Sequence, residues 1–287
     1  MKTIGVIGVG RMGHGIAANL LKAGWPLVFL DHPGNRPTGD IEVAGARRVG
    51  RVADIAAQCD TIILVVTGAP QVKAVLAGPG GLLEHLRPGT VIIDCSTSLP
   101  ETTRAIAPKV AKAGGLFLDA PMTRTPKEAA EGRLNLFVGG DVALLDAQRP
   151  MLGCFAENII HAGEIGSGHA LKLLHNFVSL GFAAVLNEAA VAARESGVAL
   201  DVFCDVLAKG GGRSTALDRL APAFTEGDTS GFNFTIANAA KDLGYYLEMT
   251  RALGLEPEAA EALAEVYGAR ERSGQGEKLV SEMVALT

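Results

Sequence analysis

The chain has 287 residues, and its 48% hydrophobic and 20% charged content excludes a protein that is disordered throughout. A formal net charge of −5 argues against a broad basic surface that would bind nucleic acid. The four cysteines lie far apart, without the spacing of a metal site or a disulfide framework, so we expect no bound metal and a cytoplasmic location. We also expect no membrane association, because no apolar run approaches the roughly 20 residues of a membrane span.

Short apolar runs alternate with helical patterns in the first half of the chain. Runs without polar alternation are typical of strands that are covered by helices on both faces, as in a parallel sheet. We therefore predict an α/β domain with a doubly wound parallel sheet over residues 1–163. The expected strands are Thr3–Ile7, Leu27–Leu30, Arg47–Val49, Thr61–Val66, Val91–Asp94 and Leu116–Asp119. The expected helices between them are Gly13–Ala23, Val52–Ala57, Gln71–Leu76 and Leu82–Leu86.

The pattern changes near Gly163, where three glycines precede a long helical stretch. Helical spacing dominates from there, which predicts an all-helical C-terminal domain over residues 164–287. Some of these stretches are apolar on every side, and helices of that kind are buried. We therefore expect a homodimer or homotetramer that assembles through the helical domain. The expected helices are His169–Ser196, Asp201–Ala208, Phe234–Leu253 and Glu256–Arg272.

A glycine-rich turn follows the first strand and opens the first helix. It reads Gly8-Val9-Gly10-Arg11-Met12-Gly13, a G-x-G-x-x-G pattern. Gly8 permits a tight turn, Gly10 lets a pyrophosphate approach the backbone, and Gly13 lets the helix pack closely on the strand. The helix N-terminus offers unpaired N–H groups and a positive dipole to phosphates. We therefore expect this turn, including Arg11 and Met12, to bind a dinucleotide.

An acidic residue stands where the second strand ends. Asp31 follows Leu27–Leu30, and a carboxylate at this place accepts hydrogen bonds from the adenosine ribose and repels a 2′-phosphate. Asp31 thus favours NAD. His32 and Arg36 follow in the same loop and can meet a 2′-phosphate if the loop folds back, although a solvated loop charge is the preferred interpretation of Arg36. NAD is the expected cofactor, and NADP stays open.

Four segments, in this order along the chain, together resemble one family of enzymes. They are the turn and helix at residues 8–24, Asp94-Cys95-Ser96-Thr97, the segment Gly166-Ser167-Gly168-His169-Ala170-Leu171-Lys172-Leu173-Leu174-His175-Asn176, and Lys241-Asp242-Leu243. This combination resembles the β-hydroxyacid dehydrogenase family. The resemblance implies a Rossmann-like N-terminal domain, an all-helical C-terminal domain and an active site in the cleft between them. It also implies hydride transfer between NAD(P) and a small anionic 3-hydroxy acid or its semialdehyde.

The resemblance also assigns roles to individual residues. It implies that Lys172 is catalytic and that Asn176 orients the substrate. Ser96 and Thr97 are placed near the nicotinamide and the substrate. Lys241 is expected to reach both the cofactor and the substrate from the helical domain.

The residue type at position 172 fits proton transfer. Oxidation of an alcohol requires a group that removes its hydroxyl proton, and burial and nearby cations lower the pKa of a lysine toward working pH. Lys172 and Asn176 are four residues apart and share one helix face. A surface lysine is the alternative interpretation of Lys172, and its apolar neighbours disfavour it.

His175 departs from the family pattern. Substrate binding and ordinary packing are both open for it.

A second departure from the family concerns the substrate anion. The segment Asp119-Ala120-Pro121-Met122-Thr123-Arg124-Thr125 stands where the family often has two glycines in place of its last two residues. An arginine binds a carboxylate or sulfonate with two parallel hydrogen bonds. The Arg124–Thr125 pair resembles that of 3-sulfolactaldehyde reductases, a branch of the family. We expect Arg124, with Ser96, Thr123 and Thr125, to bind the anion; exposure to solvent or pairing with Glu128 or Glu131 is the alternative.

A third departure lies beside the expected nicotinamide site. Val66 and Thr67 stand where the family often has Leu-Pro, and the resemblance implies that they line the nicotinamide ribose.

Two other functions remain open. Imine reductases share this architecture, but they commonly carry Asp or Tyr in place of Lys172. A non-catalytic dinucleotide-binding protein is the other alternative, although Lys172, Asn176 and Lys241 are all present.

Overall fold

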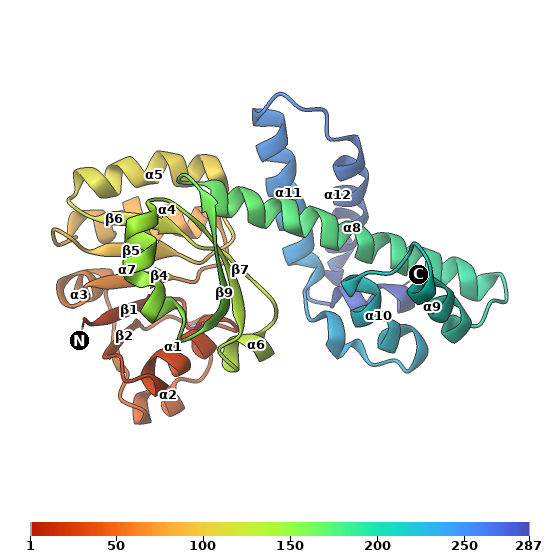
Figure 1. Cartoon of the computed structure of the whole chain (residues 1–287), viewed down its shortest axis with the longest axis horizontal. Helices are drawn as coiled ribbons and strands as arrows, with labels where there is room; N and C mark the ends of the chain where they lie inside the picture. The colour runs from red at the N-terminus through yellow and green to blue at the C-terminus, as the bar shows by residue number, and fades with distance from the viewer. Residues whose placement is uncertain (1, 287) are drawn as a thin grey trace. The chain divides into compact units, whose positions relative to one another are not determined.

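A computed structural model describes residues 2–286 (Figure 1). The chain forms two compact units. The first unit ends at Lys172 and the second begins at Leu173. A Rossmann-like sheet domain is followed by a helical one, so the predicted fold class is confirmed. Helix α8 (Ser167–Glu195) begins in the first unit and continues into the second.

The sheet of the first unit has the strand order β3-β2-β1-β4-β5-β6-β8-β7, and β9 pairs with β8. The first six strands of this order run parallel. The chain order of the strands reverses between β1 and β4, as it does in dinucleotide-binding sheets. The strands are β1 (Ile4–Ile7), β2 (Leu27–Leu30), β3 (Arg47–Val49), β4 (Thr61–Leu64), β5 (Val91–Asp94), β6 (Leu116–Asp119), β7 (Met122–Thr123), β8 (Leu134–Gly139) and β9 (Ala156–Gly163).

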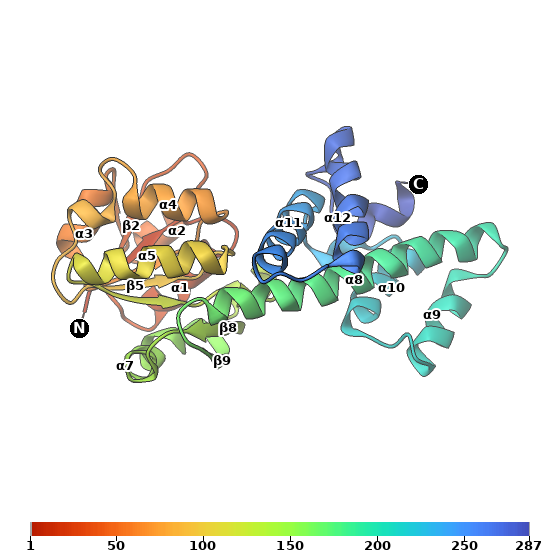
Figure 2. The ribbon, with the colours of Figure 1, turned by 90° about the horizontal axis from the view of Figure 1, so that it is seen from above.

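Helices cover both faces of this sheet, because alternate residues of each strand point to opposite faces. Ile63 and Ile93 belong to a core with α1 and α7, whereas Ile62 and Ile92 belong to a core with α3, α4 and α5. Figure 2 shows α3 and α4 on one side of the sheet and α7 on the other. The helices are α1 (Gly13–Lys22), α2 (Gly39–Val43), α3 (Val52–Gln58), α4 (Ala69–Ala77), α5 (Pro100–Lys112), α6 (Pro126–Ala130) and α7 (Val142–Leu152).

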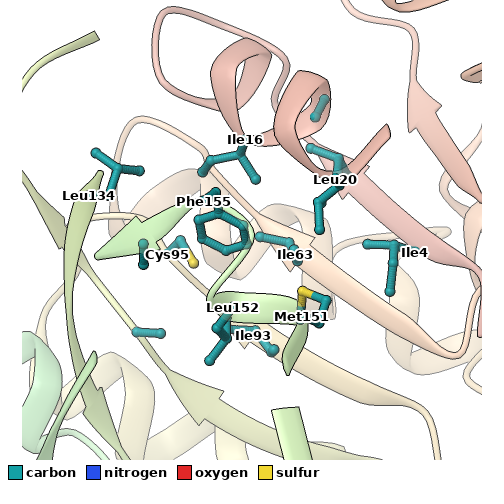
Figure 3. Packing of buried hydrophobic residues seen from close by; sticks show 14 of the residues in the cluster. Ile4, Ile16, Leu20, Ile63, Ile93, Cys95, Leu134, Met151, Leu152 and Phe155 are labelled. Carbon is teal, nitrogen blue, oxygen red and sulfur yellow. The ribbon is translucent and has the colours of Figure 1, made fainter. Parts of the chain in front are cut away.

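The core beneath α1 is built around an aromatic ring. Figure 3 shows the Phe155 side chain surrounded by Ile16, Ile63, Cys95 and Leu152. All five are at most 2% exposed, so this face of the sheet is closely packed. The packing fixes α1, and with it the glycine turn, against the strands.

The strand register places the chemically active residues along one edge. Ile7 of β1 pairs with Leu64 of β4, Leu64 with Asp94 of β5, and Asp94 with Asp119 of β6. The carboxyl ends of four parallel strands therefore form one row. Ligands of open α/β sheets bind beyond such a row, where the strand order reverses.

Up to residue 286, the second unit is built from the remainder of α8, four further α-helices and short 3₁₀ and π turns. Its core is apolar, and Tyr267 is fully buried, with its hydroxyl donating to the Leu180 carbonyl oxygen at 2.8 Å. By length and composition alone α8 is sufficient to cross a membrane, which is weak evidence because helices of soluble cores pass the same test. The further helices are α9 (Leu200–Lys209), α10 (Thr215–Thr225), α11 (Ile236–Ala252) and α12 (Glu258–Arg270).

Two features differ from the expected elements. The sheet is mixed rather than wholly parallel, because β8 runs antiparallel to β6 and β7. The sequence patterns also give no sign of β9, whose residues are mostly exposed or half-buried, since a strand of this kind lacks a continuous apolar run. The expected helix Leu82–Leu86 is a single 3₁₀ turn, Leu82–Glu84. The other elements outside the expected set are α2, α5, α6, α7, α10, β7, β8 and the 3₁₀ turns Thr229–Phe232 and Val280–Ala285.

Candidate active site

Gly10 and Gly13 of the glycine turn differ in the space that surrounds their Cα atoms. A Cβ at Gly13 would lie 2.0 Å from the Gly8 carbonyl oxygen, so the fold itself requires this glycine. A Cβ at Gly10 would meet nothing closer than the Gly34 carbonyl oxygen at 3.7 Å. The packing of the protein therefore does not explain Gly10, whereas a ligand that approaches its backbone does. The turn fits the pyrophosphate of a dinucleotide at the N-terminus of α1.

This difference between the two glycines yields a direct test. Gly10→Ala should weaken cofactor binding by roughly 10- to 100-fold, about 1.4–2.8 kcal/mol, and should leave thermal unfolding unchanged. Gly13→Ala, the matched control, should lower the free energy of unfolding by about 1–3 kcal/mol because its Cβ overlaps the backbone. Cofactor titration by fluorescence and thermal unfolding measure the two effects. Equal losses of stability in both variants would refute the assignment of Gly10 to the ligand.

The loop after β2 folds back onto the glycine turn. The side chain of Asn35 accepts from the Val9 backbone N–H at 3.1 Å, and the Arg36 backbone N–H donates to the Val9 carbonyl oxygen at 2.9 Å. Asp31 is exposed at the end of β2, and its carboxylate lies 3.7 Å from Nη1 of Arg48 on β3. The loop thus places Asn35 and the Arg36 backbone against the glycine turn, and Arg48 of β3 lies beside Asp31 at the end of β2. Sequence reasoning missed Arg48, which lies on a short strand 17 residues beyond Asp31.

A second group of residues joins the ends of β4 and β5. The Ser96 hydroxyl accepts from the Val66 backbone N–H at 3.0 Å, and the Ser96 N–H donates to Asp94 at 3.0 Å. Ser96 is buried, Thr97 is half-buried and Thr67 is exposed. Burial raises the pKa of the Cys95 thiol, so this cysteine stays protonated and is no nucleophile. The structure therefore brings Val66 and Ser96, predicted site residues at two neighbouring strand ends, into direct contact.

The first turn of α8 is bonded to the end of β6. The carboxylate of Asp119 accepts from the Gly166 N–H at 2.8 Å and from the His169 N–H at 2.9 Å. A Cβ at Gly168 would lie 2.8 Å from this carboxylate, so only glycine permits the close approach. The motif thus fixes the start of the helix that carries Lys172, which is 6% exposed.

Within the second unit, α8 and α11 are joined through a buried carboxylate. The Asn176 amide Nδ2 donates to Asp242 at 2.6 Å, and Lys241 Nζ lies 3.2 Å from the other oxygen of Asp242. His175 Nδ1 lies 3.0 Å from Asn176 Oδ1. An amide oxygen only accepts, so His175 donates here. The structure therefore links His175 and Asn176 by hydrogen bonds and Lys241 by an ion pair into one polar group around Asp242, which sequence reasoning did not single out.

Arg124 adopts an unusual backbone conformation just beyond β7. Among the described residues it is the one non-glycine residue with a positive φ, at 82°. Its Nη1 bonds to Glu157 and to the Arg133 carbonyl oxygen, so the pairing with Glu128 or Glu131 considered above does not occur. Nε and Nη2 make no hydrogen bond within the described part of the chain. Left-handed backbone costs a side-chain residue about 1–3 kcal/mol and is concentrated at functional sites.

The two threonines beside Arg124 differ in what they contact. Thr123 is buried on β7, and its hydroxyl accepts from the Asn135 amide at 3.2 Å. Thr125 caps α6, where its hydroxyl donates to Glu128 at 2.5 Å and accepts from the Lys127 N–H. The cap explains why threonine follows Arg124, since α6 begins directly after it.

Comparison with known proteins agrees with these features. Residues 3–163 match the model of the NAD binding domain of 6-phosphogluconate dehydrogenase. Residues 166–287 match the model described as NAD-binding of NADP-dependent 3-hydroxyisobutyrate dehydrogenase. The two models together cover almost the whole chain.

Individual relatives agree with the family models. An NAD-dependent L-serine dehydrogenase of Pseudomonas aeruginosa is 32% identical over 88% of this chain and 86% of its own. A 2-(hydroxymethyl)glutarate dehydrogenase of Eubacterium barkeri is 33% identical over 85% and 81%. A 3-hydroxyisobutyrate dehydrogenase of Mycobacterium tuberculosis, solved with L-serine, is 27% identical with a TM-score of 0.89, covering 100% of this chain and 99% of that one. This chain therefore belongs to the 3-hydroxyisobutyrate dehydrogenase family, also called the β-hydroxyacid dehydrogenase family, of NAD(P)-dependent oxidoreductases.

Proposed function

We propose that the protein oxidises a small anionic 3-hydroxy acid to its semialdehyde, or catalyses the reverse reduction, with Lys172 as general acid and base. The observation that carries this proposal is the buried lysine on α8, followed by Asn176 one turn later. Burying a lysine removes much of its hydration, which a protein tolerates where the amine has a task. The start of this helix is bonded to the same strand ends that hold the predicted cofactor residues.

The proposed reaction is a two-electron oxidation of an alcohol. The alcohol carbon loses a hydride and its hydroxyl loses a proton, which leaves an aldehyde. Bound NAD supplies the chemistry of accepting the hydride. The Lys172 amine takes the hydroxyl proton in oxidation and returns one in reduction. Asn176, whose amide is oriented by Asp242, holds the substrate oxygen through its second N–H, and Lys241 and His175 flank it.

The names of the relatives indicate a substrate class. L-serine, 2-(hydroxymethyl)glutarate and 3-hydroxyisobutyrate are all primary alcohols with a carboxylate on the next carbon. We assign the anionic group of the substrate to Arg124, with Ser96, Thr123 and Thr125 beside it. The guanidinium presents Nε and Nη2 as a pair of parallel donors, which matches a carboxylate or a sulfonate.

For the cofactor we propose NAD in preference to NADP. The exposed carboxylate of Asp31 at the end of β2 is placed to accept from the ribose hydroxyls and to repel a 2′-phosphate. We place the pyrophosphate of the cofactor on the glycine turn, at Gly8, Gly10, Arg11, Met12 and Gly13. Val66, Thr67 and Thr97 lie at the neighbouring strand ends, where we place the nicotinamide ribose.

The experiment that tests the proposal is steady-state turnover over a defined panel. It contains L-serine, 3-hydroxyisobutyrate, 2-(hydroxymethyl)glutarate, a sulfonate analogue, the corresponding semialdehydes and a cyclic imine, each with NAD(H) and with NADP(H). We expect turnover of at least one 3-hydroxy acid, with higher kcat/KM for NAD. Cofactor binding without any turnover would refute the proposal in favour of a binding role, and turnover of cyclic imines alone would favour imine reduction.

We further propose a homodimer or homotetramer that forms through α8. Leu174, Val178, Phe182 and Val185 are 45–62% exposed and spaced as one stripe along this helix. No Asp, Glu, Lys or Arg interrupts residues 173–187. An uncharged stripe of this kind is complementary to itself, so a second copy of the chain related by a twofold axis is the partner that it fits.

The oligomer is tested by one charge placed on the stripe. Val185→Asp should shift the protein to a smaller mass in light scattering coupled to size-exclusion chromatography, because a carboxylate would be buried without a partner. Val43→Asp is the matched control, since Val43 is 91% exposed on α2 of the first unit. Unchanged mass in the Val185→Asp variant would contradict assembly through this stripe.

A further inference from the structure

The imidazole of His169 lies at the start of α8 and is fully buried. Its Nε2 lies 3.0 Å from the Ser96 carbonyl oxygen, and its Nδ1 lies 2.7 Å from the hydroxyl of Thr103 on α5. A carbonyl oxygen only accepts, so Nε2 carries a proton and donates to Ser96. The ring therefore joins the first turn of α8 to the residues after β5 and to α5.

The backbone of the same turn is held by a different element. Both oxygens of Asp119, at the end of β6, accept backbone N–H groups of the α8 turn, as described above. A carboxylate at a helix N-terminus is favourable electrostatically. The ring of His169 thus adds a separate connection, to Ser96, that the backbone bonds to Asp119 do not supply.

Two buried carboxyl groups face this ring. Asp94 Oδ2 lies 3.9 Å from Nε2, and Asp119 Oδ2 lies 3.7 Å from Nδ1. Asp94 Oδ2 has no hydrogen-bond partner within the described part of the chain. Burial raises the pKa of Asp94, and the neighbouring His169 opposes that effect. An apolar side chain at position 169 would leave both carboxyl groups without this polar neighbour, which explains a buried histidine at this place.

We propose that His169 is a positioning residue for Lys172. Lys172 follows three residues later, so the two side chains are neighbours on the helix surface. The bond from Nε2 to Ser96 sets the separation between the turn that carries the lysine and the loop that carries Ser96. A displacement of about 1 Å between reacting groups lowers a rate by roughly 10²-fold. This inference rests on the proposed function, in which Lys172 transfers the proton.

Two conservative variants separate the role of the ring nitrogen from that of the ring itself. The amide of Gln reaches the position of Nε2, so His169→Gln keeps a donor to the Ser96 carbonyl oxygen. Asn reaches only the position of Nδ1, so His169→Asn loses that donor. We expect His169→Gln to keep most of the wild-type kcat, and His169→Asn to lose about 10- to 100-fold in kcat with unchanged KM for the cofactor. Equal kcat values for His169→Asn and the wild type would overturn the proposal.

A double variant shows whether the effect passes through the lysine. In a Lys172→Ala background, His169→Asn should cause no further loss of kcat, because the group that it positions is gone. A full additional loss in that background would overturn the proposal in favour of a general structural role. If His169→Asn does not fold, Thr103→Val keeps the test open. It removes the hydroxyl bonded to Nδ1 with little change of shape, and we expect a smaller loss of kcat that also disappears in the Lys172→Ala background.

Amide hydrogen exchange gives a readout that does not depend on activity. His169→Asn should speed exchange over Gly166–Lys172, and His169→Gln should not. If the wild type turns over no hydroxy acid while this difference in exchange is present, the proposed function fails and the anchoring of the turn stands. Unchanged exchange together with unchanged kcat would refute the inference itself.

Discussion

Lys172→Met should remove most of the turnover while the protein stays folded and binds its cofactor. A positioned general acid or base contributes about 10²–10⁴-fold to a rate, and methionine keeps the length and apolar stem of lysine without the amine. We therefore expect kcat to fall by that factor and thermal unfolding to change little, since the side chain remains buried. Steady-state kinetics on the best substrate and cofactor titration measure the two properties.

Controls separate the loss of an amine from a loss of structure. Lys112→Met, at the exposed end of α5, should keep wild-type kcat. Lys172→Ala leaves a cavity, and added methylamine should restore part of its rate by supplying the missing amine. If Lys172→Met keeps most of the wild-type kcat, the acid–base assignment is wrong, and His175 or Lys241 becomes the next candidate.

Arg124→Gly should weaken substrate binding without destabilising the fold. Charge-assisted hydrogen bonds contribute about 1.5–3 kcal/mol, which corresponds to KM rising by roughly 10- to 150-fold for an anionic substrate. Glycine adopts the φ of 82° freely, so it relieves about 1–3 kcal/mol of backbone strain. The greater freedom of glycine in the unfolded chain offsets about 0.5–1 kcal/mol of that gain, and the loss of the part-exposed bonds to Glu157 and the Arg133 carbonyl oxygen offsets about 0.5–1 kcal/mol more. The free energy of unfolding should therefore stay level or rise slightly.

The opposite pattern would identify a structural arginine. If Arg124 only ties β7 to β9 through Glu157, Arg124→Gly lowers the unfolding temperature and leaves KM unchanged. Arg124→Lys is the matched variant, because it keeps the charge and the strained backbone but loses the fork of two parallel donors. We expect its KM to lie between those of the wild type and Arg124→Gly. Chemical unfolding and KM for the carboxylate and sulfonate substrates distinguish the cases.

The sequence predicts β1, β4 and β5 because their side chains are buried on both faces, whereas the exposed strand β3 is predicted by its place in the strand–helix alternation alone. The strands Val91–Asp94 and Leu116–Asp119 have the expected bounds, because apolar runs ending in a carboxylate are typical of the carboxyl edge of a parallel sheet. The glycine turn was equally clear, since its spacing has a mechanical reason. Half-exposed elements such as β9 carry no comparable pattern.

The candidate site was only partly predictable, because several of its contacts join residues far apart in the sequence. His169 was visible as a member of the glycine motif, but its bond to Thr103 spans 66 residues. The bond between Asn176 and Asp242 also spans 66 residues. The positive φ of Arg124 reflects the backbone path between β7 and α6, which local sequence does not specify. No single-sequence pattern encodes such pairings.

One measurement tests the proposed reaction most directly. The best substrate of the panel is labelled with deuterium at its alcohol carbon, and the reduced cofactor is analysed by mass spectrometry after turnover. We expect one deuterium on the nicotinamide ring, because the hydride passes directly from that carbon to the cofactor. Reduced cofactor without deuterium, or no reduction with any labelled 3-hydroxy acid, would contradict the proposed hydride transfer.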